Sequence, residues 1–286
     1  MRLEWKEIKN HFDWLFLALV NTAILLPFRR NSKPAYCFGC AWVLLVMACM
    51  LAVGDVYSQD ALSIVRKADE RSRGITSRAE VTIRIVRPSW SREMTMKIWS
   101  KGNKLAMILV TSPAKDRGIA FLKRNKEVWN WLPSIERNIK LPPSMMSQRW
   151  MGTDFTNDDL VKEASITEDY IHAFAGEETL EGRSCYRIVL LPKPESAVVW
   201  GKLVVWIDKK DYLMMKVEYF DEDELLVNTL EAGEVGMLGG RLLPTRLEMR
   251  PADEPGNKTV MEYHSLVFDQ PISDDFFSTR NMQTIR

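Results

Sequence analysis

The sequence predicts a mainly β (α+β) fold with a single curved antiparallel sheet of about 11 strands. Three observations support this prediction. One short helical pattern precedes a long succession of strand-like segments, tight turns separate these segments, and strands do not alternate with helices. A sheet of this width rarely stays flat, so we expect it to curl. Because one helix cannot fill a strongly curled sheet, we expect the concave face to form an apolar cleft.

The composition is that of a globular protein with ample material for a hydrophobic core. The chain has 286 residues, of which 46% are hydrophobic and 27% are charged. Its 39 basic residues are balanced by 38 acidic ones, which argues against a nucleic-acid-binding domain. Ten tryptophans and fifteen methionines supply large and adaptable apolar side chains.

Two apolar runs, over residues 14–28 and 38–53, precede the predicted fold. Each run is shorter than the ~20 residues that a membrane-spanning helix needs. The second run follows a basic stretch and is followed by the small residue Ser58, which is typical of a cleaved secretory signal. We therefore predict export, with residues 1–58 as N-terminal extension and signal peptide and residues 59–286 as one domain. A retained anchor in the inner membrane is the alternative.

The cysteines give a second alternative for the N-terminal region. Cys49 lies in a sequence that loosely resembles a lipoprotein cleavage box, so lipidation of Cys49 is also open. Cleavage after Ser58 leaves Cys185 as the remaining cysteine, which excludes an intramolecular disulfide in the mature chain. Cys185 lies in a strand-like run, and we expect it to be a small buried apolar residue.

A helix is predicted over residues 60–73, at the start of the folded region. Leu62, Val65 and Ala68 form one apolar stripe at helical spacing, and Gly74 provides the C-terminal stop.

The hydrophobic period then changes from about 3.6 residues to about 2. Apolar and polar residues alternate over residues 79–85 and 94–99, on the two sides of a turn at 88–91, which predicts a long hairpin with one apolar face. Turn-forming residues separate the segments that follow. The further candidate strands are 105–111, 118–123, 126–132, 137–141, 171–175, 184–191, 202–207, 213–220, 225–235, 241–250 and 258–267.

The strand pattern stops between residues 142 and 162. This stretch is rich in methionine and tryptophan and continues into an acidic run. Thr156 followed by Asp159 approximates a capping box, which predicts the start of a short helix. Two interpretations stay open: a helical insertion that covers one sheet edge, and a mobile apolar lid.

No motif in the sequence requires catalysis. His172 and His264 are far apart in the sequence and lack a zinc-binding pattern, and neither a nucleophile elbow nor a phosphate-binding glycine loop is present. Asp154, Asp158 and Asp159 form the one acidic cluster that could hold a metal or perform acid–base chemistry. Helix capping explains them as well. We expect no catalytic residue, no cofactor and no metal; metal-dependent lipid hydrolysis at these aspartates is the enzymatic alternative.

The candidate binding residues are the large apolar side chains beside the expected cleft. Residues 129 and 131 are tryptophans that share one face of a strand. The candidates for the lining of the apolar cavity or its lid are Trp129, Trp131, Met145, Met146, Trp150, Met151 and Phe155. For each of them, ordinary core packing is the alternative.

Several motifs occur in a characteristic order over residues 60–286. The chain has W-L-P-S at 131–134, L-P-P at 141–143, G-T-D-F-T-N-D-D-L at 152–160 and I-S-D-D-F-F at 272–277. This pattern resembles the LolA-like outer-membrane lipoprotein-sorting proteins, in particular the branch often associated with RND/MMPL-type exporters. The resemblance implies a half-barrel of the LolA/LolB type, with helices that cover an apolar cavity.

The resemblance also implies a function. It predicts a periplasmic carrier that shelters the acyl chains of lipoproteins or lipids in the cavity for outer-membrane sorting. The predicted partners are these acyl chains and an RND/MMPL-type membrane transporter, with no nucleic acid. The alternative is a non-catalytic periplasmic accessory subunit of such an exporter.

Overall fold

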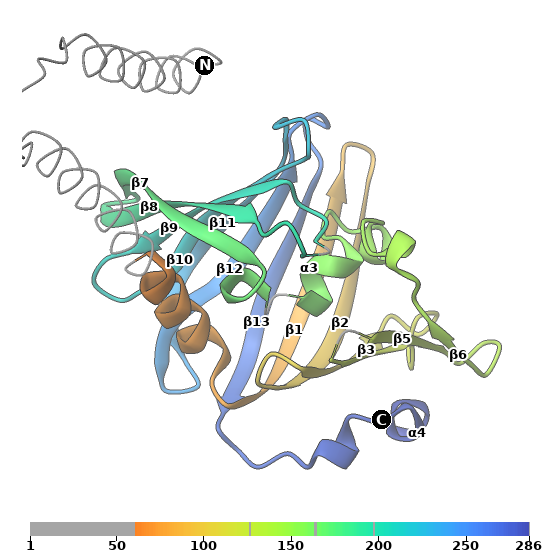
Figure 1. Cartoon of the computed structure of the whole chain (residues 1–286). Coiled ribbons are helices and arrows are strands. Elements are labelled where there is room, and N and C mark those ends of the chain that lie inside the picture. The colour runs from red at the N-terminus through yellow and green to blue at the C-terminus, as the bar shows by residue number, and fades with distance from the viewer. Residues whose placement is uncertain (1–60, 126, 163–164, 197, 286) are drawn as a thin grey trace, which may run out of the picture. The chain divides into compact units, whose positions relative to one another are not determined.

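A 13-stranded antiparallel sheet forms the frame of the structure (Figure 1). The structure is a computed structural model and describes residues 61–285, except residues 126, 163–164 and 197. The predicted extension and signal peptide, including Cys49, lie outside the described residues. No helix in the described part of the chain combines the length and the apolar character needed to cross a membrane.

The sheet confirms the predicted fold class, although the expected number of strands was slightly low. Every candidate segment forms a strand and pairs with its neighbour, so the sheet has 13 strands rather than about 11. The strand order is β6-β5-β4-β3-β2-β1-β13-β12-β11-β10-β9-β8-β7. The bounds are β1 (Thr76–Arg87), β2 (Trp90–Lys101), β3 (Leu105–Ser112), β4 (Ala120–Arg124), β5 (Glu127–Leu132), β6 (Arg137–Lys140), β7 (Tyr170–Leu180), β8 (Arg183–Pro192), β9 (Lys202–Asp208), β10 (Met214–Phe220), β11 (Leu226–Leu238), β12 (Arg241–Pro251) and β13 (Lys258–Phe268).

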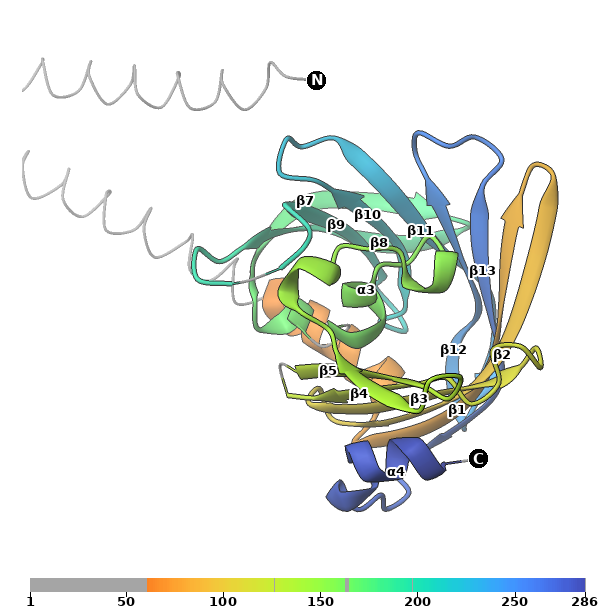
Figure 2. The same ribbon diagram turned by 90° about the vertical axis from the view of Figure 1, so that its right-hand side faces the viewer.

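The two edge strands of the sheet, β6 and β7, are consecutive in the sequence. The residues that join them, 141–169, form the crossing segment. It contains four short helices, which are η1 (Pro143–Met145), η2 (Trp150–Gly152), α3 (Asn157–Lys162) and η3 (Ser165–Thr167). Figure 2 shows this segment within the curve of the sheet. The first and the last strand, β1 and β13, pair in the middle of the sheet.

The helix predicted near the start of the folded region is present over residues 61–73. It ends at Gly74, which has a φ of 66° and donates its backbone N–H to the carbonyl oxygen of Glu70 at 3.0 Å. Glycine tolerates this left-handed conformation because it has no Cβ. The helix packs its apolar stripe, with Ala61 and Val65 fully buried, against the sheet.

One apolar face runs continuously across the sheet. Ile188, Val205, Val217 and Leu230 are successive register partners from β8 to β11, and the helix over residues 61–73 packs on them. The same face continues through Met249, Thr259 and Ile85 in β12, β13 and β1. It is the concave face, which the helix and the crossing segment cover (Figure 2).

The convex face is covered at one end by the C-terminal residues. η4 (Asp274–Phe276) and α4 (Thr279–Thr284) lie outside the curve of the sheet, beneath β1 to β3 in Figure 2. Phe277 and Met282 from this region pack with Met107 and Leu122 of β3 and β4. This end of the sheet is therefore covered on both faces.

Candidate functional site

The candidate site is the apolar part of the concave face beneath the crossing segment. Five side chains on β1 and β2 are fully buried there, at 0% exposure: Val81, Ile83, Ile85, Met94 and Met96. Trp150 and Phe155 of the crossing segment belong to the same hydrophobic cluster. The Trp150 ring packs against Phe121 of β4, with ring centroids 5.3 Å apart. Side chains of the crossing segment therefore close this part of the concave face.

Other predicted lining residues lie near Trp150 but not all in one cluster. Met151 is partly buried and packs against the cluster that contains Trp150 and Phe155. Met146 is buried in a small separate cluster with Val128 of β5. Met145 is half-buried in η1, and its carbonyl oxygen accepts a hydrogen bond from the Asn157 side chain at 2.9 Å.

Two predicted lining residues lie on the opposite face of the sheet. Trp129 is the register partner of Leu122, whereas the neighbouring residue Phe121 faces Trp150. Trp129 and Trp131 pack in the convex cluster beneath the C-terminal helix. This corrects the expectation that all the candidate residues line one site. The physical reason is the alternation of a strand, which puts 129 and 131 on one face but does not tell which face is concave.

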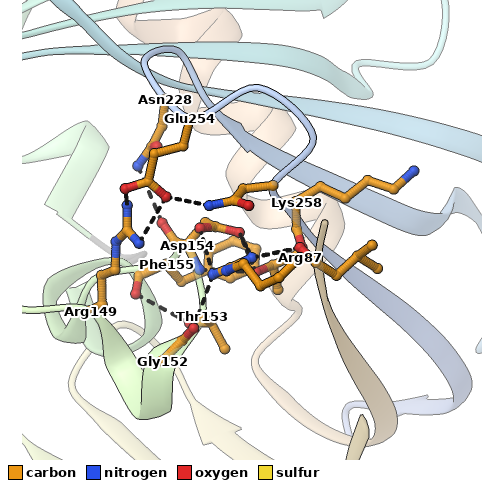
Figure 3. Close-up of polar contacts among 12 residues, drawn as sticks. Arg87, Arg149, Gly152, Thr153, Asp154, Phe155, Asn228, Glu254 and Lys258 are labelled. Carbon is orange, nitrogen blue, oxygen red and sulfur yellow. Dashed lines mark hydrogen bonds and ion pairs between the residues drawn. The ribbon is translucent and has the colours of Figure 1, made fainter. Parts of the chain in front are cut away.

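The crossing segment is tied to the sheet by a buried ion pair between Arg87, at the end of β1, and Asp154 (Figure 3). Arg87 Nη2 donates to Asp154 Oδ1 at 2.9 Å, and Nη1 donates to Oδ2 at 3.1 Å. The Arg87 side chain is 9% exposed and that of Asp154 is 0% exposed. Arg87 Nη2 also donates to the carbonyl oxygen of Gly152 at 3.1 Å. Such a bidentate, charge-assisted pair fixes orientation as well as distance.

Thr259 of β13 completes this attachment. Its Oγ1 donates to Asp154 Oδ2 at 2.7 Å and accepts the backbone N–H of Asp154 at 2.9 Å. We call Arg87, Asp154 and Thr259 the latch. In β11, the Asn228 side chain adds a bond to the Asp154 carbonyl oxygen at 3.2 Å.

A second ion pair holds the crossing segment nearer the surface. Arg149 contacts both carboxylate oxygens of Glu254, in the hairpin between β12 and β13, at 2.7 and 3.2 Å (Figure 3). The hydrogen bond with Glu254 raises the pKa of Arg149, and the hydrogen bond from Arg149 lowers the pKa of Glu254. The Arg149 and Glu254 side chains are both more than a third exposed. Solvent screens their attraction, so this ion pair contributes less to stability than the latch.

The residues between Trp150 and Phe155 form a tight loop that shapes the latch. Trp150 donates its backbone N–H to the Phe155 carbonyl oxygen at 2.8 Å, and Thr153 Oγ1 donates to the Trp150 carbonyl oxygen at 2.7 Å. Gly152 has a φ of 80°, a conformation that favours glycine. The loop thereby directs Trp150 and Phe155 into the apolar cluster and Asp154 toward Arg87.

A family model and several solved structures match this chain. A family model described as that of an uncharacterised protein matches residues 102–284. A DUF1329 family protein from Desulfovibrio piger is similar in structure, with 21% identity, a TM-score of 0.73 and coverage of 79% of this chain and 99% of that chain. An outer membrane lipoprotein-sorting protein domain from Vibrio parahaemolyticus has 21% identity and a TM-score of 0.71, again covering 79% of this chain and 99% of that one.

A LolA superfamily protein from Nitrosomonas europaea is 26% identical, with a TM-score of 0.68 and coverage of 77% of this chain and 98% of that chain. The chain belongs to the LolA-like family. No curated protein sequence matches it.

In this LolA-like chain, the predicted capping box is present at the start of α3. The Asp159 backbone N–H donates to Thr156 Oγ1 at 3.1 Å, and Asp159 Oδ2 accepts the Thr156 backbone N–H at 2.7 Å. Trp200 Nε1 donates to Asp159 Oδ1 at 2.7 Å. Burial raises the pKa of the Asp159 carboxyl to about 6, against the opposing effect of these hydrogen bonds.

The acidic cluster of the LolA-like chain serves internal contacts. Asp154 belongs to the latch and Asp159 to the capping box, and the described residues include no group of three metal-ligating side chains. His172 and His264 lie apart: His172 Nε2 contacts the Ile166 carbonyl oxygen at 2.7 Å, and His264 Nε2 contacts Thr82 Oγ1 at 2.6 Å. The side chains of Asp154, Asp159, His172 and His264 therefore each contact another group of the protein.

The latch residues contributed by the sheet were not singled out in the sequence, although one signal was visible. Inward positions of β1 fall at Ala79, Val81, Ile83 and Ile85, and Arg87 is the next residue in this alternation. A buried arginine side chain is favourable only with a countercharge or hydrogen-bond acceptors beside it, so this position predicts such a partner. No comparable signal marks Thr259 or Asn228. Both are polar residues in strands that are distant in the sequence from Asp154, so no local pattern connects them with it.

Proposed function

We propose that this protein is a periplasmic carrier that shelters the acyl chains of lipoproteins or lipids for sorting to the outer membrane. The observation that carries the proposal is the way in which the concave face is closed. Its apolar side chains are covered by Trp150 and Phe155, and these belong to a connection between two sheet edges rather than to the sheet itself. The crossing segment can therefore lift without breaking a strand pair.

The energies involved are compatible with displacement of this cover by an acyl chain. Burying about 14 methylenes stabilises a bound chain by on the order of 10 kcal/mol, at about 0.8 kcal/mol per methylene. Uncovering a large apolar side chain costs roughly 1.5–3 kcal/mol. The gain from the acyl chain exceeds the combined cost of uncovering Trp150 and Phe155, and opening of the latch opposes it further. Methionines such as Met94 and Met96 beneath them can adapt to the shape of the incoming chain.

The proposal includes export to the periplasm by the N-terminal signal, with an inner-membrane anchor as the alternative. It assigns no catalytic role to any residue. Like the carrier role, periplasmic location is supported by the LolA-like fold together with the signal-like sequence before residue 59.

Native mass spectrometry of the full-length gene product, purified as the cell exports it, tests the carrier function. We expect bound acyl lipids or, after delipidation, uptake of a fluorescent fatty acyl probe. Phe155→Asp places a charge beneath the crossing segment and should abolish uptake, whereas Trp131→Phe on the convex face should leave uptake unchanged. A wild-type protein that binds neither lipid nor probe would contradict the proposal.

The second candidate function is a non-catalytic accessory subunit of an RND/MMPL-type exporter. One observation favours it: the 0% exposure of Ile83, Ile85 and Met94 means that no water-sized space adjoins these side chains. Two hollows of about 420 and 440 Å³ lie elsewhere, beside the helix over residues 61–73 and beside the β7–β8 turn. Co-purification with an exporter of this class, combined with absence of lipid binding, would select this function.

A further inference from the structure

Two residues that adjoin Phe121 on the concave face each have a buried polar atom without a hydrogen-bond partner among the residues that the structure describes. One is Nε1 of Trp150, a residue that is 1% exposed, and the other is Oδ1 of Asn130 in β5. The large majority of buried side-chain polar atoms in proteins have a hydrogen-bond partner. Because an unpaired buried group is unfavourable, a pair of them in one place points to a ligand that supplies the missing partners.

The two residues that carry these atoms both adjoin Phe121. Asn130 is the register partner of Phe121 on the neighbouring strand, so the two side chains stand side by side on the concave face. The Trp150 ring packs on Phe121, with an angle of 58° between the ring planes. The next register partner of Phe121, Ile108, is apolar and buried. A donor and an acceptor thus flank Phe121 in otherwise apolar surroundings.

The chemistry of the two atoms defines the missing group. An indole N–H can only donate, and an amide oxygen can only accept. A hydrocarbon chain satisfies neither atom. The carbonyl oxygen of an acyl ester or acyl amide accepts from Trp150, and the N–H of an acyl amide also donates to Asn130. An ether, which has neither a carbonyl oxygen nor an N–H, is the poorest match.

We propose that Trp150 and Asn130 recognise the carbonyl linkage of a fatty acyl chain, and that an amide linkage satisfies both residues. This inference rests on the proposed carrier function and adds a specificity to it. Because Trp150 closes the concave face and Asn130 lies on that face, a chain between the crossing segment and the sheet meets both side chains. The hydrocarbon supplies most of the affinity, and the two polar atoms select the linkage that follows it.

Three ligands with the same hydrocarbon chain test the proposal: N-methylhexadecanamide, methyl hexadecanoate and hexadecyl methyl ether. Each competes with a fluorescent fatty acyl probe for the full-length protein. We expect the amide to bind more tightly than the ester and the ester more tightly than the ether, each by about threefold to tenfold, which is the ratio for one net hydrogen bond.

Two variants show which residue causes each difference in affinity. Trp150→Phe keeps an aromatic ring against Phe121 but removes the N–H, so the preference for ester over ether should disappear. Asn130→Leu should remove the preference for amide over ester and retain that for ester over ether. Trp131→Phe, on the convex face, is the matched control and should change neither ratio.

The outcomes separate this inference from the carrier function. Equal affinities of the wild type for the three ligands, or unchanged ratios in Trp150→Phe, would overturn the linkage specificity while the carrier function stands. Absence of binding of all three ligands would overturn both. Trp150→Phe also leaves a cavity where the indole was, so denaturant unfolding establishes only that the variant is folded, and the ratios of the ligand affinities carry the test.

Discussion

Arg87 and Asp154 form a bidentate buried ion pair that joins the end of the first strand to the middle of the crossing segment. The two residues are 67 positions apart in the sequence. Through Thr259, the same carboxylate is also bonded to the last strand of the sheet. The latch therefore connects the crossing segment to the two strands that meet in the middle of the sheet, and it governs how easily the segment separates from the concave face.

Replacement of Arg87 by methionine should strongly destabilise the closed form. The change leaves the Asp154 carboxylate buried without its countercharge, and loss of one partner of a buried pair typically costs about 3–5 kcal/mol. Denaturant unfolding measures the loss, and hydrogen exchange should rise most in residues 150–155. Arg84→Met is the control, because Arg84 pairs with Glu93 on the surface and is 47% exposed. Its expected effect is below about 1 kcal/mol; equal effects of the two changes would contradict a special role of the latch.

The double variant Arg87→Met, Asp154→Leu should recover much of this loss. Replacement of both partners of a buried pair by apolar groups is often neutral or stabilising, since no uncompensated charge is left. A double-mutant cycle from denaturant unfolding gives the coupling between the two sites. Additive losses would show that Arg87 and Asp154 contribute independently.

The sequence pattern predicts the strands, and with them the inward position of Arg87, better than it predicts where the strands end. Alternation over β1 and β2 predicts the hairpin and its apolar face, and the pattern of apolar segments between turn-forming residues identifies the other strands of the sheet. It fails at the end of β7, which extends to Leu180 instead of ending near residue 175. Residues 176–179 are polar or glycine and largely exposed at the sheet edge, so no apolar alternation marks them.

The faces of the sheet are harder to predict than its strands. The pattern at Trp129 and Trp131 shows that they share a face, but the element that covers this face comes from the far end of the chain. Phe277 and Met282 carry no local signal of that contact. The capping box of Thr156 and Asp159, by contrast, depends on residues three apart and was predicted correctly.

Removal of the Phe277 side chain should destabilise the fold without affecting the concave face. Phe277 is fully buried between the C-terminal residues and the convex face of β3 and β4. Truncation of a buried phenylalanine to alanine typically costs about 3–5 kcal/mol. Denaturant unfolding of Phe277→Ala checks the loss. Uptake of an acyl probe under native conditions should equal that of the wild type; reduced uptake by folded protein would place this cluster in the binding site.

Protonation of Asp159 should make the protein more stable in mild acid. Its pKa is raised from an ordinary value of 3.8 to about 6 by burial, so the folded state binds this proton more tightly than the unfolded state. The resulting stabilisation is fully present below the unfolded pKa and is lost as the pH rises through about 6. The contribution across this window is roughly 2–3 kcal/mol.

Denaturant unfolding at several pH values between 4 and 7 measures this contribution. Asp159→Asn should flatten the dependence in that window, and Asp223→Asn, in the exposed hairpin between β10 and β11, controls for the loss of one carboxylate. An identical pH dependence in Asp159→Asn and the wild type would show that Asp159 does not take up the proton.

The pairing of β1 with β13 limits when the sheet can form completely. Synthesis from the N-terminus delivers β1 early, and the strand that pairs with it, β13, is made only after the eleven strands between them. Until then, one border of β1 offers free backbone groups to any neighbouring extended chain. Pairing of the sheet is therefore completed at its centre, and the free edge of β1 needs protection until β13 has been made.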